Sequence, residues 1–293
     1  MTPYDFDSLE TPRVTLELPE RLRALLACAC RTIVDAEDRM AVETLAVAVA
    51  SLAWRQFLVR RPPTDNRSEH EFIVLGNILR IAQGERLPRS ELGIAAAFAF
   101  LHDTHFIPRI TEWQIRSVER EAAAASDPAD ATRLRQQAEL LKQGKATQRQ
   151  RHMLGGAENA RRLLPTLTSP LDDSQSLFTH EEIERCAELI AHHDDWKLGR
   201  PYPARHDRLA VACVEGDALW PLHPLGIFAD LERPNEQGAI RDIYAPSEWR
   251  RQALESLQTL IEYRRNWPAD EPGFIDRQTI FRTKTGWELF DQW

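Results

Sequence analysis

The stretch IAAAFAFLHDTHF, residues 94–106, governs the interpretation of this chain. Its first eight residues are apolar and show no strand-like alternation, a pattern that favours a buried helix. The run then ends abruptly on His102 and Asp103. An imidazole beside a carboxylate suits a borderline divalent metal ion. A hydrogen-bonded core histidine next to a carboxylate at a helix end is the structural alternative, and this pair alone does not decide between the two.

The rest of the chain has the periodicity of packed helices. Apolar residues recur every three or four positions from Leu22 to Ile33, which predicts an amphipathic helix there. No alternation is long enough for a central sheet, so the expected fold class is all-α. Further helices are predicted over residues 39–60, 70–84, 90–103, 153–164, 180–193, 208–220 and 247–264.

Residues 118–150 differ from their surroundings because they are polar and poor in core residues. They predict a protruding helical hairpin, which is either a solvent-facing insertion or a mobile lid. We expect one domain over residues 1–293, with a helical core at about 67–225 that contains this insertion. A helical N-terminal extension precedes the core. A C-terminal extension, about 226–293, follows it, and its aromatic end is expected to pack back onto the body.

Composition limits the class of protein. The 293 residues are 43% hydrophobic, which is enough for a sizeable core, and the net charge of −8 argues against non-specific nucleic-acid binding. The four cysteines include no C-x-x-C pair, so neither a zinc knuckle nor a disulfide framework is indicated. The N-terminus lacks an apolar signal core, and the longest apolar run, 45–54, is too short to span a bilayer. We therefore expect a cytoplasmic protein without a membrane partner. The sequence leaves homo-oligomerisation open.

Metal-capable side chains recur at helical segments along the chain. A charged aspartate within an apolar helix is costly to bury unless a cation pairs with it. A divalent ion would pair with it and would also account for neutral imidazoles on neighbouring helices, as in helical two-metal proteins. The residues concerned are His70, His102 with Asp103, His152, His192 with His193, and Asp217.

The order of these residues resembles the HD-domain superfamily of metal-dependent phosphohydrolases. The segment LHDT, residues 101–104, is similar to the family's defining motif, and RLAVACVEGDALW, residues 208–220, is similar to the helix that carries its final aspartate. The resemblance covers about residues 67–225. It implies a helical HD-type bundle that binds one or two divalent transition metals, and the ligand types accept iron, manganese, nickel, cobalt or zinc.

The resemblance also implies roles for individual residues. One metal would be held by His70, His102, Asp103 and Asp217. Asp103 would bridge to a second metal, held by His152 together with His193, His192 or both. The implied reaction is hydrolysis of a phosphate ester by a metal-activated hydroxide, with His102 and Asp103 in catalytic roles. The implied substrate is a nucleotide or another small phosphorylated metabolite.

Substrate contacts are less clearly marked. Many members of the superfamily carry a lysine shortly after the His-Asp pair, whereas this chain has Thr104, His105 and Phe106. A phosphate needs cationic or hydrogen-bonding partners close to the metals. The candidates in this chain are His105, Arg109, Arg151, Lys197 and Arg200.

Two other functions use the same residues. A small branch of the superfamily holds two irons and uses oxygen to cleave C–C or C–P bonds, with a single histidine in its fourth ligand segment. The order of ligands does not separate that chemistry from hydrolysis. The third hypothesis is a non-catalytic module that binds a nucleotide or a protein, although such a module has no need of every metal ligand.

Overall fold

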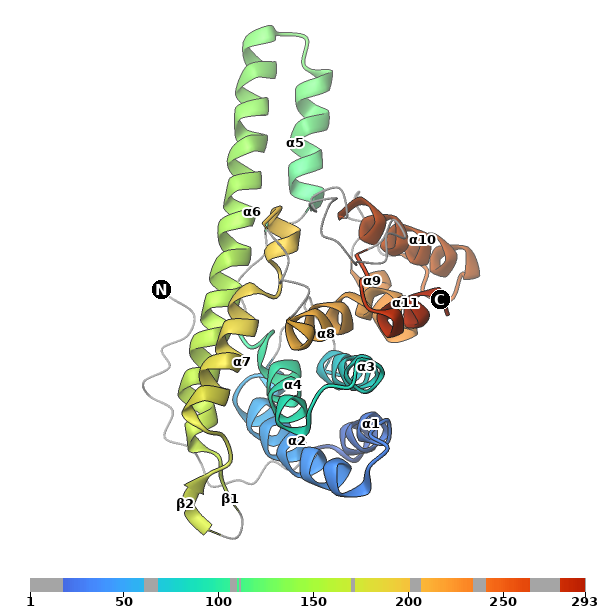
Figure 1. Ribbon diagram of the computed structural model, residues 1–293. Coiled ribbons are helices and arrows are strands. Elements are labelled where there is room, and N and C mark those ends of the chain that lie inside the picture. Colours follow the sequence, from blue (N-terminus) through green and yellow to red (C-terminus); the bar gives the residue numbers. More distant parts are fainter. Residues whose placement is uncertain are drawn as a thin grey trace.

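The fold is a stack of helices with almost no strand (Figure 1). Within the part of the chain described, eleven α-helices and one two-stranded hairpin are present. The all-α prediction is therefore confirmed. The computed structural model describes residues 18–60, 68–105, 110, 112–169, 172–200, 207–233, 241–263 and 280–292.

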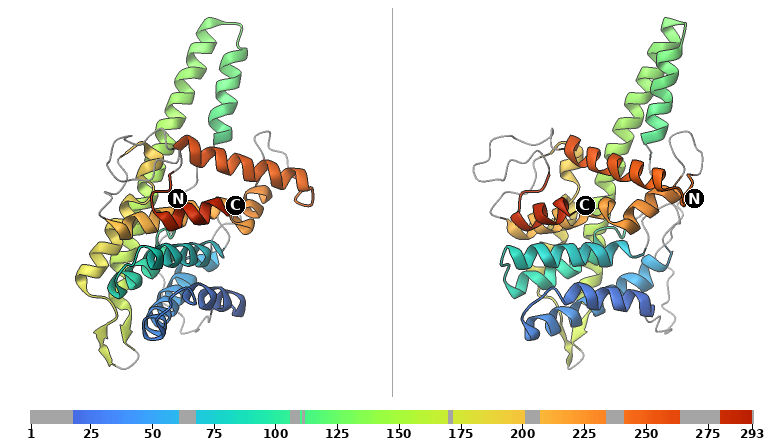
Figure 2. Two further views of the ribbon diagram at one scale, coloured as in Figure 1. Left: turned by 45° about the vertical axis from the view of Figure 1, so that its right-hand side comes forward. Right: turned by 90° about the vertical axis from the view of Figure 1, so that its right-hand side faces the viewer.

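The first four helices form two layers, which Figure 2 shows from two sides. Helices α1 (Glu20–Cys30) and α2 (Ala36–Gln56) form the lower layer, followed by the short 3-10 helix η2 (Leu58–Arg60). Helix α1 packs on α3 (His70–Gly84), and α2 packs on α4 (Arg89–Leu101). Every residue of α4 from 92 to 101 is buried, which fixes the direction in which its C-terminal end delivers the His-Asp pair.

One stretch of the described chain, Ala36–Arg60, is long and apolar enough to cross a membrane by length and composition. It corresponds to α2 and η2. In this fold 44% of its most apolar window is buried, and α2 packs against α1 and α4. A core helix of a compact bundle meets the same criterion, because both settings select apolar residues. The absence of a membrane partner stays a prediction.

Helix α6 is much longer than the sequence analysis indicated. A polar hairpin followed by a separate core helix at 153–164 was predicted, but α6 runs without interruption from Pro128 to Leu163. Its first part pairs with α5 (Glu112–Ala124) to form the hairpin, and its second part packs on α7 (His180–His192) (Figure 1). No proline lies between Pro128 and Leu163, so nothing in the sequence ends the helix.

The segment after α6 reverses the chain towards α7. The 3-10 helix η3 (Leu164–Thr166) leads into an antiparallel hairpin of β1 (Thr168–Ser169) and β2 (Asp172–Ser176), between the two helices predicted at 153–164 and 180–193. These polar residues lack the alternation that marks a strand. Helix α7 begins at a capping box, since Thr179 and Glu182 exchange both hydrogen bonds. The 3-10 helix η4 (Asp195–Leu198) follows α7.

The C-terminal helices cover the upper side of the core. Helix α8 (Arg208–Ala218) packs on α3, and η5 (Trp220–Leu222), α9 (Pro224–Glu232), α10 (Pro246–Tyr263) and α11 (Lys284–Asp291) follow. The buried carboxylate of Glu215 anchors the last segment, because it accepts hydrogen bonds from the backbone N–H groups of Arg282 and Thr283 and from the Thr283 hydroxyl. Burial raises the pKa of Glu215 to about 7. The aromatic end therefore packs back onto the body, as Phe281 shows by being fully buried.

Close contact between α8 and α3 leads to a testable prediction. A Cβ added at Gly216 would lie 2.4 Å from Cγ1 and 3.0 Å from the backbone N of Ile78. We expect Gly216→Ala to destabilise the fold by about 1–3 kcal/mol, because α3 and α8 must move apart. Gly76→Ala is the matched control, since its Cβ would meet Ala29 at no less than 3.6 Å. The control is expected to gain up to about 1 kcal/mol from better helix propensity. Urea unfolding of both variants tests this, and a Gly216→Ala variant as stable as wild type would contradict it.

Candidate metal centre

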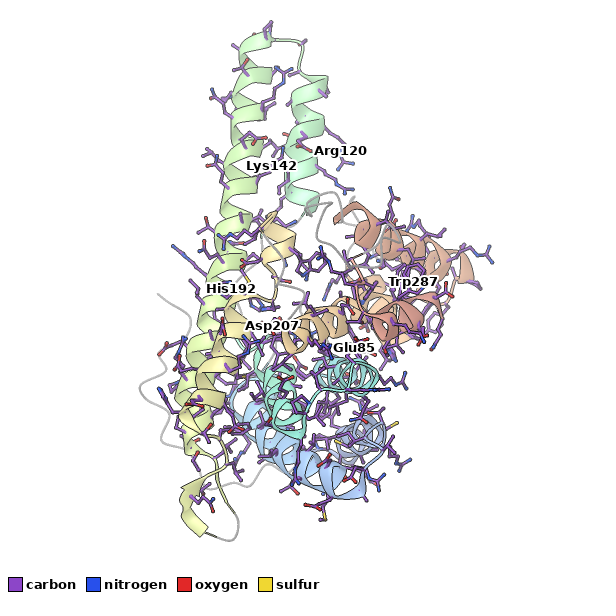
Figure 3. All side chains as sticks on the ribbon, viewed as in Figure 1. Glu85, Arg120, Lys142, His192, Asp207 and Trp287 are labelled. Carbon is purple, nitrogen blue, oxygen red and sulfur yellow. The ribbon has the colours of Figure 1, made fainter. Side chains whose placement is uncertain are left out.

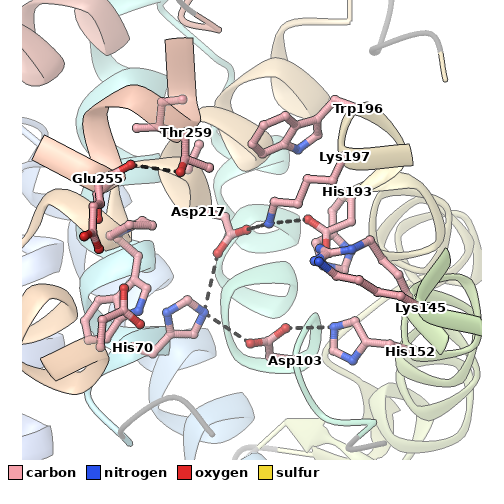
Figure 4. Close-up of a pocket in the computed structure, with 18 of the residues that line it drawn as sticks. His70, Asp103, Lys145, His152, His193, Trp196, Lys197, Asp217, Glu255 and Thr259 are labelled. Atoms are coloured by element: carbon pink, nitrogen blue, oxygen red, sulfur yellow. Dashed lines mark hydrogen bonds and ion pairs between the residues drawn. The ribbon is translucent and has the colours of Figure 1, made fainter. Parts of the chain in front are cut away.

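Two groups of metal-capable side chains meet where α3, α4, α6 and α7 converge (Figure 4). One group is His70, His102 and Asp103, and the other is Asp103, His152 and His193. Within each group the donor atoms all lie within 4.8 Å of one another. Asp103 belongs to both. The described residues therefore contain two adjoining sites that can hold a metal ion.

The first group has the spacing of a coordination shell. The Nε2 atoms of His70 and His102 are 3.1 Å apart, and Asp103 Oδ2 lies 3.5 Å from His70 Nε2. Asp217 Oδ1 lies 3.5 Å from each of the same two nitrogens. Ligand atoms bound about 2.1 Å from one ion at tetrahedral or octahedral angles stand about 3.0–3.4 Å apart. His70, His102 and Asp103 thus have the spacing of ligands around one ion, and Asp217 approaches the two imidazole nitrogens at a similar distance.

Asp103 joins the two groups through its two oxygens. While Oδ2 faces His70, Oδ1 lies 2.9 Å from His152 Nε2. The ring of His193 lies beside that of His152, with centroids 5.6 Å apart. A carboxylate with one oxygen on each side is the geometry of a bridging ligand between two cations.

Backbone carbonyls hold three of the imidazoles in place. The Nδ1 of His102 lies 3.0 Å from the carbonyl oxygen of Ala99. The Nδ1 of His152 lies 2.7 Å from the carbonyl oxygen of His105, and the Nδ1 of His193 lies 2.7 Å from the carbonyl oxygen of Ile190. Because a carbonyl oxygen only accepts, each Nδ1 donates to its carbonyl, and Nε2 is the ring nitrogen that faces the centre. Metal-binding histidines almost always have such an outer hydrogen bond.

The ionisable side chains of the centre are buried close to one another, which shifts their pKa values. Burial alone lowers the pKa of His102, but Asp103 and Asp217 outweigh it and raise the pKa to about 9. Burial also lowers the pKa of His193, to about 4, against the attraction of Asp194. Burial opposes ionisation of Asp103, yet His102 and His152 hold its pKa well below the usual range. Ionised carboxylates at this depth require cationic partners, which a divalent ion supplies.

Only one residue of the His192–His193 pair reaches the centre. His193 is 2% exposed and belongs to the second group. The side chain of His192 is 61% exposed, and its Nδ1 lies 2.6 Å from Asp195 Oδ2. Successive helical residues point about 100° apart, so the end of α7 can direct only one of the two inwards. The structure places His192 outside both groups.

A cavity of about 740 Å³ opens onto the centre. The base of the α5–α6 hairpin forms one wall, and α9 and α10 form another, so the C-terminal extension helps to enclose the site. The sequence analysis did not predict this role for the extension. Besides the metal-capable residues, the lining includes Arg116, Lys145, Arg149, Asp194, Trp196, Lys197, Asp230, Gln252, Glu255 and Thr259.

Of the predicted substrate contacts, Lys197 lies in the cavity. Its Nζ is 2.6 Å from Asp194 Oδ1 and 3.9 Å from Asp217 Oδ2, beside the first group (Figure 4). Arg200 does not line the cavity, and its guanidinium lies 3.0 Å from Asp195 Oδ1. Arg109 lies outside the described residues.

The other two predicted contacts also point elsewhere. The ring of His105 packs over Gly155, where an added Cβ would lie 2.2 Å from the ring, and it does not line the cavity. His105 contributes instead through its carbonyl, which orients His152. Arg151 is exposed on α6 and is likewise absent from the lining. The structure therefore does not place either side chain where it could contact a substrate in this cavity.

Arg149 and Asp194 were not found by the sequence analysis. Arg149 lies three residues before His152 and thus on the same face of α6, whereas Arg151 directly precedes His152 and is turned about 100° away. The Arg149 guanidinium donates to the Asp194 carboxylate. Burial opposes ionisation of Asp194, but Lys197 and Arg149 hold its pKa well below the usual range. Helical spacing from His152 is the signal that would have identified Arg149.

Comparisons of the chain with protein-family models, with characterised proteins and with solved structures return no match. The geometry of the centre and its surroundings is therefore the basis for inferring a function.

The separation of His192 from His193 leads to a prediction about metal content. We expect His193→Ala to bind less metal than wild type, because it removes a buried nitrogen donor from the second group. His192→Ala is the matched control from the neighbouring position, and its metal content should equal that of wild type. Elemental analysis after equilibration with manganese, iron or zinc measures both. Equal losses in the two variants would contradict the placement of the pair.

Proposed function

We propose that this chain is a metal-dependent hydrolase of phosphate esters of the HD-domain type, acting on a nucleotide or a small phosphorylated metabolite. The observation that carries the proposal is the sharing of Asp103 between two ligand groups, one completed by Asp217 and the other by His152 and His193. The all-α fold and the order of the ligands along the chain support the same family.

The donor set fits the metals that the resemblance implies. It consists of imidazole nitrogens and carboxylate oxygens, which suit iron, manganese, nickel, cobalt and zinc. Divalent ions at this position would supply Lewis-acid activation of water and neutralisation of phosphate charge. The carbonyl partners of His102, His152 and His193 keep the donors oriented before any ion binds, which limits reorganisation on binding.

Cationic side chains beside the centre favour a phosphorylated substrate. Lys197 lies within 3.9 Å of Asp217, and Arg149 shares Asp194 with it. A phosphate bound at the centre can accept hydrogen bonds from both cations, and its charge rises as the ester bond breaks. Before a phosphate binds, Asp194 holds the two cations in position. Trp196 and Trp220 also line this cavity and add aromatic surface to it.

A second candidate function has one observation in its favour. Helix α7 contributes a single histidine to the centre, His193, and a single histidine in this segment is the pattern of the di-iron oxygenases within the superfamily. Such an enzyme would consume oxygen and cleave a C–C or C–P bond instead of hydrolysing a phosphate ester. A non-catalytic binding module has less support, because no position of the donor set is lost.

The experiment combines metal analysis with a substrate screen. Purified protein, supplied in turn with each candidate metal, is incubated with p-nitrophenyl phosphate and with a panel of nucleotides and sugar phosphates. We expect inorganic phosphate to be released with at least one metal. Asp103→Ala should lose both bound metal and phosphate release to background, because it removes the ligand that both groups share. Asp130→Ala, at the exposed start of α6, is the control and should retain both.

Circular dichroism of each variant verifies that the helical fold is intact. An Asp103→Ala variant that keeps its metal and its rate would refute the proposal. Iron-dependent oxygen uptake without phosphate release would indicate that the protein is the oxygenase described above and not a phosphate-ester hydrolase.

A further inference from the structure

A line of cations on α6 leads away from the metal centre. Four basic residues follow one another at intervals of three, four and three positions, so they share one face of the helix: Lys142, Lys145, Arg149 and His152. At 1.5 Å per residue, Lys145 lies about 10 Å and Lys142 about 15 Å from His152 along the helix axis. These four residues form a basic stripe that extends along the hairpin, and the candidate metal ligand His152 is its inner end.

The stripe forms one wall of a groove between α5, α6 and η4. This groove has a volume of about 320 Å³, and Arg116 enters it from the opposite helix. Among the residues that the structure describes, its lining contains five cationic side chains and a single carboxylate, Glu119. Four of the cations also line the central cavity, so the two spaces adjoin: Arg116, Lys145, Arg149 and Lys197.

Carboxylates flank the two ends of the groove. At the outer end, Lys142 Nζ lies 3.0 Å from Glu119 and 2.7 Å from Glu139. At the inner end, Asp194 pairs with Arg149 and Lys197. Among the described residues, cations outnumber carboxylates in the lining of this concave space, which opens onto the centre. A multiply charged anion gains more from such a groove than from isolated surface cations.

The opposite wall of the cavity carries both signs of charge. Helices α9 and α10 present Asp230 and Glu255 there, together with the uncharged Gln252 and Thr259, and Arg233 lines the same wall with its guanidinium 2.7 Å from Asp230 Oδ1. In Figure 4, Glu255 and Thr259 lie on the other side of Asp217 from Lys145 and Lys197. Among the described lining residues cations are most numerous on the hairpin wall, so an anionic group is attracted there most strongly.

We propose that the α5–α6 groove is a second anion subsite, which binds a further phosphate of a substrate whose reacting phosphate lies at the metal centre. The substrate class is thus a phosphate ester with at least two phosphate groups. This assignment rests on the proposed function, because it specifies the substrate of the same centre. The distance of about 10 Å along α6 from His152 to Lys145 is more than one phosphate group spans.

Lys145→Gln tests the subsite, since it removes the charge while keeping a polar side chain of similar shape. Arg120→Gln is the matched control, because Arg120 is exposed on the neighbouring helix α5 and lines neither space (Figure 3). Calorimetry measures the binding of inorganic tripolyphosphate and of orthophosphate to the full-length protein, with manganese in excess over the polyphosphate. Arg116→Gln, from the other wall of the groove, provides a second test variant in case Lys145→Gln does not fold.

We expect wild type to bind tripolyphosphate more tightly than orthophosphate. Lys145→Gln should weaken tripolyphosphate binding about tenfold through loss of one charge-assisted contact. Orthophosphate binding should stay unchanged, and Arg120→Gln should match wild type for both anions. Lys145→Gln should also lower kcat/KM for substrates with two or more phosphates by more than it lowers p-nitrophenyl phosphate turnover.

The results separate this inference from the proposed function. If wild type hydrolyses no phosphate ester, the proposed function fails, while tripolyphosphate binding still decides whether the groove is an anion subsite. Equal weakening by Lys145→Gln and Arg120→Gln would overturn the subsite, because it would indicate a general effect of surface charge. Unchanged tripolyphosphate binding in Lys145→Gln, or in Arg116→Gln if that variant is the one used, would overturn it as well.

Discussion

The structure depends on a buried carboxylate whose two oxygens face different imidazoles. Asp103 is 7% exposed, and its charge is stabilised there by the imidazoles of His102, His152 and His70, which three different helices supply. This requirement determines how α3, α4 and α6 converge. It also explains why α4 is apolar over its whole buried length: that helix must be fixed firmly in the core if the group at its end is to meet partners on several other helices.

Small residues permit this convergence. A Cβ at Gly156 would lie 2.9 Å from the backbone oxygen of His102, so the absence of a side chain lets α6 approach the end of α4. Gly216 allows the equivalent approach of α8 to α3. Both glycines lie within four residues of a metal-capable side chain, His152 or Asp217. The close packing of the backbones thus helps to fix the distances between the donor atoms.

Local patterns predicted most of the core helices and the set of metal-capable residues, because periodicity and residue type are properties of short segments. They did not predict which of His192 and His193 turns inwards, since this depends on the residue at which α7 ends. Adjacency in sequence suggested Arg151, whereas helical geometry places Arg149 beside His152. The wall formed by α10 was not predictable from local patterns, because it arises from how the C-terminal helices fold back over α8.

The uninterrupted course of α6 makes the hairpin and the metal centre parts of one rod. Residues added to both arms beyond Lys142 would lengthen the rod and leave its lower part as it is. One residue added between Arg149 and His152 would instead rotate everything above by about 100° and turn Lys145 away from the groove. The hairpin is therefore free to vary in length at its tip, but the segment between Lys145 and His152 is constrained in helical phase.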